Sequence, residues 1–400
     1  MMINPNRKII SRLVFLFSMS ISLLTIIPAL FPALYASIFN PSILDKVVFL
    51  NKIQVSSTET GIWFYPIIIT CIILFSIYVI FKIKSIKLPT FDVSKKVSVI
   101  TMILFLILFT GISYQGIVSV DPHGDWPFVK DAVDHWPPGE IGFGTHVKLF
   151  LLSTSSTIFG NYRIVPFLAS AALIVTTYMI TNKITNNRVS GLLSSAIVLQ
   201  SNLFLTYSST PTYTTFWVLF YVVSIYLILH KAWILSPVSY IVSLLSKPLT
   251  ATFLPFSIFF IWNTEIPIKN KIIISSISII IIGIGAAIIA QSSLDGLNWE
   301  EFWIGFTSFS YQLRFDAIIV IFLLPVIIGL FIISKNNRYA NNISIMISGI
   351  LITNPILMGL TQITSQPYRF IPLIVFFAIG AGMLISKNQN KSNQNKSKKN

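Results

Sequence analysis

The sequence predicts an all-helical protein that crosses a membrane about twelve times. Hydrophobic side chains make up 54% of its 400 residues and charged side chains only 10%, whereas about a quarter of the residues of a soluble domain are charged. Apolar runs of about 18–25 residues recur along the chain, and this length crosses the hydrocarbon core of a bilayer. The predicted fold class is therefore a polytopic α-helical membrane protein.

The apolar runs place the expected spans along most of the chain. They lie at residues 12–35, 62–82, 97–119, 164–182, 189–206, 213–230, 232–246, 249–263, 271–291, 316–334, 341–359 and 369–386. The two short runs on either side of SKPLT could instead form one broken or re-entrant segment, because proline interrupts a helix. The first run is longer than the core of a signal peptide, so we expect it to stay in the protein as a span.

The distribution of charge orients these spans. With the N-terminus in the cytoplasm, 20 of the 28 Lys and Arg residues lie on the cytoplasmic side, and 11 of the 13 acidic residues lie outside. The positive-inside rule requires this asymmetry. The net charge of +15 thus reflects topology, and the scattered basic residues form no nucleic-acid recognition motif. We expect a multi-pass membrane protein without a nucleic-acid partner, in the plasma membrane of a prokaryote rather than in an organelle.

One long extracytoplasmic loop, residues 120–163, concentrates titratable side chains. Five of the 13 acids and two of the four histidines occur in DPHGDWPFVKDAVDHWPPGE, residues 121–140. The segment 141–160 has the hydropathy of a span, but counting it as one would invert the charge asymmetry of every later loop. We therefore expect this segment to lie on the outer membrane surface as an interfacial helix, with His146 and Lys148 reaching toward the water.

Several motifs follow one another in the order of a known enzyme family. Asp121 comes just after a span and precedes PPG by about sixteen residues, and a short amphipathic segment ending in IFG leads into NYRIVPFLASAALIV. Later, SLLSKPLTATFLPF carries a Lys at the end of a short segment, and SQPYRFIPLIVFFAIGAG carries an Arg where a span begins. This order resembles the GT-C superfamily of membrane glycosyltransferases, closest in style to the dolichyl-phosphate-mannose protein mannosyltransferases and the aminoarabinose transferases.

The resemblance implies a GT-C-like fold and an inverting glycosyltransferase, here a hexosyltransferase. Such an enzyme moves a sugar from a polyprenyl- or dolichyl-phosphate donor to a protein, lipid or glycan acceptor at the extracytoplasmic face. Residues 97–386 would form the catalytic membrane domain, preceded by an N-terminal region, 1–96, with two extra spans. Residues 387–400 form a basic tail of low complexity that we expect to be disordered. The chain contains no P-loop, no CxxC and no HExxH motif, and no soluble catalytic domain.

The expected catalytic chemistry depends on the acids of the long loop. Asp121 suits a general base, because it lies where the chain leaves the membrane and an inverting transfer needs a group that takes the proton of the acceptor hydroxyl. The family pairs this acid with a second one, which Pro122 replaces here, so Asp125 or Glu140 could take that role. A divalent metal ion bound by Asp121, His123 and Asp125 stays open, since carboxylates and imidazole are metal ligands.

Side chains at span ends are candidates for binding the substrate. The cationic candidates for holding the departing phosphate are Arg163, Lys247 and Arg369, and the further candidates are Glu140 and His123. Arginine suits this task because its guanidinium makes a two-pronged contact with phosphate. A plainer interpretation is that a cation at a span end anchors the helix at the membrane surface. Asp131 and Asp134, at helical spacing, are interpreted as solvated loop charges.

Two other classes of protein stay open. A secondary transporter would show repeated halves and ionisable residues at mid-membrane depth, whereas the ionisable residues of this chain gather at the outer boundary. A non-catalytic subunit of a membrane complex would not need the acid, the PPG and the Arg residues in this order. The glycosyltransferase is the interpretation that uses all of these features.

Overall fold

The described part of the chain in this computed structural model is helical and contains no strand. The structure describes residues 5–31, 34, 60–83, 92–119, 121, 123–137, 145–290, 297–312, 316–361 and 367–386. The chain divides into two compact units, residues 92–286 and residues 1–91 together with 287–400. The expected catalytic region, 97–386, therefore extends over both units, and the expected disordered tail, 387–400, lies outside the described residues.

Five helices in the described part are long and apolar enough to cross a bilayer. They are Lys8–Leu30, Lys95–Val118, Ile164–Thr185, Tyr339–Leu360 and Pro367–Ile385. Shorter apolar helices accompany them at Phe64–Ile80, Phe216–Leu229, Leu235–Ser246, Pro248–Trp262 and Ala317–Ile333. This composition of apolar helices is that of a helical membrane protein, as expected. Each expected span contains a helix, but the twelve crossings stay a prediction because several helices are shorter than a bilayer core.

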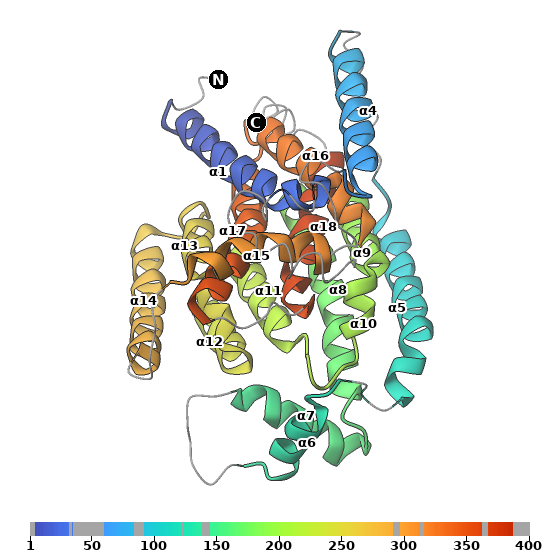
Figure 1. The fold of residues 1–400 in the computed structure, drawn as a ribbon, viewed down its shortest axis with the longest axis vertical. Coiled ribbons are helices and arrows are strands. Elements are labelled where there is room, and N and C mark those ends of the chain that lie inside the picture. The colour runs from blue at the N-terminus through green and yellow to red at the C-terminus, as the bar shows by residue number, and fades with distance from the viewer. Residues whose placement is uncertain are drawn as a thin grey trace, which may run out of the picture. The chain divides into compact units, whose positions relative to one another are not determined.

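The unit of residues 92–286 is a set of helices joined mostly by short turns (Figure 1). Its elements are α5 (Lys95–Val118), α6 (Trp126–Asp134), α7 (His146–Phe159), α8 (Ile164–Thr185), α9 (Arg188–Gln200), α10 (Asn202–Tyr207), α11 (Phe216–Leu229), α12 (Leu235–Ser246), the 3-10 helix η1 (Pro248–Phe253), α13 (Leu254–Trp262) and most of α14 (Ile268–Ala290). Helix α8 packs against α5, α7, α9 and α11, so it forms the centre of the unit.

Capping side chains divide the expected span 189–206 into two helices. The side chain of Asn187 accepts the amide of Ser190 at 2.9 Å and begins α9. The hydroxyl of Ser201 accepts the amide of Phe204 at 3.1 Å and begins α10. The second cap lies inside the expected span, so α9 and α10 form one interrupted segment.

The two short runs around SKPLT form two helices separated by η1. Lys247 is extended, with φ −160°, and ends α12, and Pro248 begins η1. The hydroxyl of Tyr240 donates to the main-chain oxygen of Thr250 at 2.9 Å, and the Ser243 hydroxyl lies 3.1 Å from that of Thr250. These bonds hold η1 against α12, so Lys247 lies at a sharp bend of the backbone.

Helix α7 occupies the segment that we expected to lie on the membrane surface. Its 14 residues are fewer than the about 20 that cross a bilayer. Gly160 ends the helix at φ 64°, a left-handed conformation that favours glycine. The Ser155 hydroxyl donates to the main-chain oxygen of Asn161 at 2.6 Å and accepts the amide of Val165 at 3.1 Å. The chain therefore reverses between α7 and α8 and cannot form one continuous span there.

Helix α7 presents one apolar face to the rest of its unit and another to the surroundings. The buried cluster that joins α6, α7, α8 and α11 consists of Val133, Leu152, Ala169 and Phe216. On the other side of α7, Phe150 and Ile158 are exposed. A short helix with one apolar face packed inward and apolar side chains exposed on the other suits a position at the boundary between membrane and water. Figure 1 shows α6 and α7 together at one end of the helices of this unit.

The second unit contains α1 (Pro5–Leu30), α4 (Phe64–Ile83), α15 (Trp299–Gln312), α16 (Ala317–Ile333), α17 (Tyr339–Thr361), the 3-10 helix η2 (Pro367–Phe370) and α18 (Ile371–Ile385). Helix α17 packs against α1, α15, α16 and α18. A glycine permits the contact between α15 and α17, because a Cβ atom on Gly305 would lie 2.3 Å from Cα of Pro355. Helix α15 lies between two expected spans and was not expected as a helix.

Candidate active site

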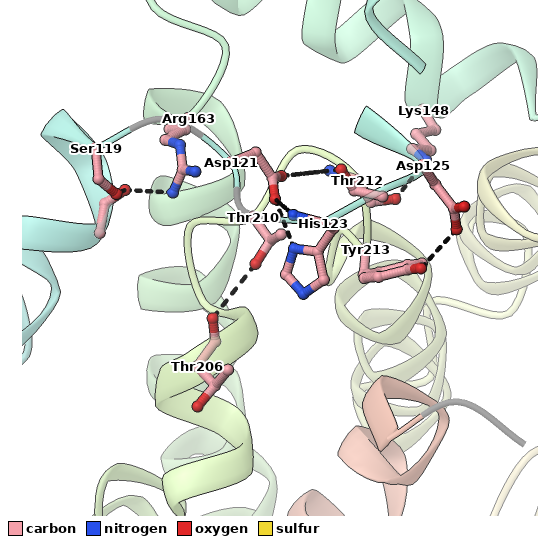
Figure 2. Close-up of polar contacts among 11 residues, drawn as sticks. Ser119, Asp121, His123, Asp125, Lys148, Arg163, Thr206, Thr210, Thr212 and Tyr213 are labelled. Atoms are coloured by element: carbon pink, nitrogen blue, oxygen red, sulfur yellow. Dashed lines mark hydrogen bonds and ion pairs between the residues drawn. The ribbon is translucent and has the colours of Figure 1, made fainter. Parts of the chain in front are cut away.

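Asp121 follows the end of α5 and turns its carboxylate into the protein, where 0% of the side chain is exposed. Its Oδ1 atom accepts the main-chain N–H of His123 at 3.1 Å and lies 2.5 Å from Nδ1 of the same ring. Its Oδ2 atom accepts the main-chain N–H of Thr212 at 3.2 Å and the Thr212 hydroxyl at 2.9 Å. Burial alone would raise the pKa of Asp121, but these hydrogen bonds outweigh it and lower the pKa. Asp121 is therefore a charged and fully bonded carboxylate (Figure 2).

Thr212 belongs to a hydroxyl-rich loop between α10 and α11. The buried members of this loop are Ser208, Ser209, Thr210, Thr212, Thr214 and Thr215. Ser170 of α8 anchors the loop, because its hydroxyl donates to the main-chain oxygen of Ser208 at 2.7 Å and lies 2.9 Å from the Thr215 hydroxyl. Buried hydroxyls need such partners. The central helix thus fixes the position from which Thr212 binds Asp121.

His123 lies between the buried carboxylate and two tyrosines. The centre of its ring is 5.6 Å from that of Tyr207 and 4.8 Å from that of Tyr213, which it meets edge-on. The His123 side chain is 21% exposed. Figure 2 shows the ring edge opposite Asp121 pointing away from the carboxylate. If Nδ1 carries the proton toward Asp121, Nε2 keeps its lone pair and can accept another proton.

Asp125 is connected to His123 through Tyr213. The Tyr213 hydroxyl donates to Oδ2 of Asp125 at 2.6 Å. Asp125 is exposed and precedes α6 without capping that helix by its side chain. The structure thus brings Asp121, His123 and Asp125 into one network, but it assigns Asp125 to Tyr213 and not to Asp121.

Lys148 corrects one expectation from the sequence. We expected it to reach toward the water, but its Nζ atom donates to the main-chain oxygen of Thr212 at 2.6 Å (Figure 2). Burial lowers the pKa of Lys148 to about 8, although the negative charges of Asp121 and Asp125 favour its protonated form. The lysine therefore belongs to the site, on the side of Thr212 opposite the carboxylate.

Arg163 directly precedes α8 and lies at the end of α5. Its Nη1 atom donates to the main-chain oxygen of Gly116, and its own amide is bound by the side chain of Asn161 at 2.9 Å. Burial lowers the pKa of Arg163, and the charge of Asp121 opposes this shift. The Nη2 atom is buried and has no hydrogen-bond partner within the described residues. One donor of this guanidinium is thus oriented by the backbone, and another has no hydrogen-bond partner among the described residues.

Of the remaining cationic candidates, Lys247 lies in the same unit as Asp121 and Arg369 in the other unit. The Nζ atom of Lys247 lies 6.0 Å from the ring centre of the buried Trp217, at the bend after α12. Arg369 lies in η2, in the other unit, and its Nε atom is buried without a hydrogen bond to any residue in the described ranges. Glu140 lies outside the described residues. Within the unit of residues 92–286, the structure therefore groups only Arg163 of the expected cations with Asp121, and it adds Lys148.

The other acids of the long loop form surface pairs. Lys130 donates to Asp134 at 2.5 Å, and the Tyr162 hydroxyl donates to the other oxygen of Asp134 at 2.6 Å. Asp131 and His135 are both exposed, with 3.3 Å between Oδ1 and Nδ1. Hydrogen bonds from Lys130 and Tyr162 lower the pKa of Asp134. Asp131 and Asp134 are thus surface charges on α6, the position that their helical spacing led us to expect.

The arrangement of the site limits where a metal ion could bind. In the part of the chain that the structure describes, no three His, Cys, Asp or Glu side chains come close enough to share a metal ion. Asp121 already uses both oxygens for bonds to His123 and Thr212, and Asp125 is turned toward Tyr213. The expected trio of Asp121, His123 and Asp125 is thus a hydrogen-bond network.

Sequence reasoning missed the second half of the site. Lys148, Tyr207, Thr212 and Tyr213 were not among the candidates, although they complete the surroundings of Asp121 and His123. The polar stretch SSTPTYTT between two apolar runs was the available signal for Thr212 and Tyr213. Comparison with known proteins adds no relative, because no family model, no curated protein and no solved structure matches this chain.

Proposed function

We propose that this protein is a membrane glycosyltransferase that moves a sugar from a polyprenyl-phosphate donor to an acceptor at the extracytoplasmic face. The observation that supports it most directly is the buried Asp121 carboxylate with two cations, Lys148 and Arg163, within the reach of its charge. Such a transfer needs a negative centre to accept a proton and positive groups to stabilise the departing phosphate. Both kinds of group occur here in one site.

The location of the site favours a donor with a lipid carrier. Asp121 follows α5 and Arg163 precedes α8, and both helices are long and apolar enough to cross a bilayer. A phosphate attached to a polyprenyl chain would be held at this boundary, with its chain in the lipid. The buried Nη2 atom of Arg163 offers a donor for that phosphate. We place the site at the extracytoplasmic face on the asymmetry of Lys and Arg in the loops.

The GT-C superfamily is the class of enzyme to which we assign the chain, with twelve spans and the loop 120–163 outside. The order of Asp121, the PPG motif and Arg163 supports this assignment, as does α7, a short helix with exposed apolar side chains between two long apolar helices. From the same order of motifs, Arg369 stays a prediction for phosphate binding, and its buried Nε atom has no hydrogen-bond partner within the described residues.

Transfer can be tested in membranes that contain the full-length protein and supply natural acceptors. Polyprenyl phosphate carrying radiolabelled mannose or glucose serves as donor, and both the release of polyprenyl phosphate and the labelling of protein, lipid and glycan fractions are measured. We expect label transfer with wild type, and a loss of about 100- to 10,000-fold in rate with Asp121→Asn.

Asp131→Asn is the matched control, because Asp131 lies on the same loop and is exposed. It should change the rate less than about twofold, since solvated surface charges contribute little. A protein that transfers sugar from a nucleotide sugar without any lipid carrier, or that transfers none from any polyprenyl-phosphate hexose, would contradict the proposed function.

A further inference from the structure

The hydrogen bonds of Asp121 leave its carboxylate no free position for a substrate. A carboxylate has two oxygens with about four lone-pair sites. His123 donates two hydrogen bonds to Oδ1, and Thr212 donates two to Oδ2. The side chain is also completely covered, with 0% exposed. An acceptor hydroxyl that approached Asp121 would have to break these bonds before giving up its proton.

His123 has the exposed position that Asp121 lacks. Its ring is 21% exposed, and the edge opposite the carboxylate points away from it (Figure 2). Tyr207 and Tyr213 pack against the ring, so its orientation is held from both sides. A carboxylate bonded to Nδ1 fixes the proton on that nitrogen and stabilises the imidazolium that forms when Nε2 takes up a second proton.

We infer that His123 is the catalytic base of this site and that Asp121 is the positioning residue behind it. This inference rests on the proposed function and changes the identity of the proton acceptor. The acceptor hydroxyl gives its proton to Nε2 while its oxygen forms a bond to the anomeric carbon. The bond between that carbon and the phosphate oxygen breaks, and its electron pair leaves with the polyprenyl phosphate. The imidazolium then returns its proton to water.

The charged and titratable groups around His123 agree with this role. Asp121 is the only ionised group within the described residues that is bonded to the ring, and Tyr207 and Tyr213 are the titratable groups packed against it. Asp125 acts at one remove, because Tyr213 donates to it. Among the described residues, the ring thus has one carboxylate as its hydrogen-bond partner.

The inference is tested by measuring kcat and KM of variants in membranes, with the polyprenyl-phosphate hexoses as donor. His123→Gln should lower kcat by about 100- to 10,000-fold and leave KM for the donor within about threefold, because the base acts on the acceptor. Imidazole added to His123→Ala should restore part of kcat, which a purely structural role would not allow. Thr212→Val is a graded control, since it removes one of the four bonds to Asp121 and should lower kcat by only about tenfold or less.

A second measurement does not depend on transfer. Diethyl pyrocarbonate modifies the free nitrogen of a neutral imidazole, and mass spectrometry reports the extent at each of the four histidines, with the exposed His135 as internal reference. At about pH 6 we expect His123 to react several-fold faster, relative to His135, in Asp121→Asn than in wild type, because the carboxylate that stabilises the unreactive imidazolium is gone.

The outcomes separate the two proposals. If sugar transfer occurs and His123→Gln retains the wild-type kcat, the histidine is not the base, while the glycosyltransferase stands. If no polyprenyl-phosphate hexose is used but Asp121→Asn speeds the modification of His123, the proposed function fails and the pairing of His123 with Asp121 is supported. Modification of His123 that is unaffected by Asp121→Asn would overturn the positioning role of Asp121.

Discussion

Lys148 and Asp121 are joined through a single residue, Thr212. The Nζ atom of Lys148 donates to the main-chain oxygen of Thr212 at 2.6 Å, while the amide and hydroxyl of Thr212 bind the Asp121 carboxylate. One loop residue, Thr212, thus accepts a hydrogen bond from a cation and donates hydrogen bonds to an anion. Any change that moves Thr212 should therefore disturb both charges together.

The first prediction concerns the pH dependence contributed by Lys148. Its pKa in the folded protein is about 8, below the ordinary value of 10.5. Below pH 8 Lys148 is protonated in both the folded and the unfolded state, so folding bears the full cost of burying its charge. Between pH 8 and about 10 the folded state releases the proton first, so this cost is relieved as the pH rises. Stability should therefore increase over this window, by on the order of 1–3 kcal/mol.

Thermal unfolding in detergent at pH 7.5 and pH 9.5 measures this effect. From pH 7.5 to pH 9.5 the apparent Tm of wild type should rise relative to that of Lys148→Met, which lacks the titrating group. Lys130→Met is the matched control, because Lys130 is on the surface and its pKa is raised by Asp134. If Lys148→Met and wild type change in parallel, the lysine is not buried as described.

Arg163 should act on donor binding as well as on turnover. Phosphate is charged before the reaction as well as during it, so a group that holds it stabilises both states. Arg163→Gln should raise KM for the polyprenyl-phosphate donor by about tenfold or more, which corresponds to about 1.4 kcal/mol.

Arg188→Gln provides the control for Arg163→Gln. Arg188 forms an ion pair with Asp92, with 3.5 Å between Nη1 and Oδ2, at the start of α9. Both substitutions remove one guanidinium from the end of a helix in the same unit. Only the change at Arg163 should alter KM, and equal effects of the two would indicate a general loss of structure.

A third prediction uses two glycines of α5. A Cβ atom on Gly116 would lie 2.8 Å from Oγ of Ser209, in the loop that carries Thr212, whereas nothing lies within 4 Å of a Cβ atom on Gly111. Gly116→Ala should cost about 1–3 kcal/mol through overpacking and should lower the transfer rate, since it displaces the loop. Gly111→Ala should be neutral or slightly stabilising, because alanine is the better helix former. Equal apparent Tm values for both variants would show that the loop gives way without cost.

The fourth prediction concerns the topology of α5. Single cysteines at Lys95→Cys and Asp131→Cys, in a background with Cys71→Ser, lie at the first residue of this helix and beyond its end, both at exposed positions. A thiol reagent that does not cross membranes should label position 131 from outside intact cells and position 95 only after permeabilisation. This expectation follows from the excess of Lys and Arg in the loops assigned to the cytoplasm. Labelling of both positions from the same side would contradict the orientation.

The sequence by itself determined the class of fold. Apolar runs of bilayer length require helices, because a backbone in lipid must satisfy its own hydrogen bonds, and the described helices lie where those runs are. It also singled out Asp121, His123 and Arg163, because titratable side chains are rare in this chain and gather at the ends of two long runs. Helix boundaries were less predictable, since the break at Ser201 depends on one hydroxyl.

Only the tertiary structure decided what surrounds Asp121. Thr212 lies 91 residues further along the chain and reaches the carboxylate because Ser170 fixes its loop to α8. Lys148 looked like a solvated surface cation, since hydropathy cannot tell which side of an amphipathic helix packs inward. The sequence placed Asp121 where the chain leaves the membrane, but it did not show that the carboxylate is buried and fully bonded. Burial and hydrogen-bond partners are properties of packed segments, and the order of residues along one segment does not contain them.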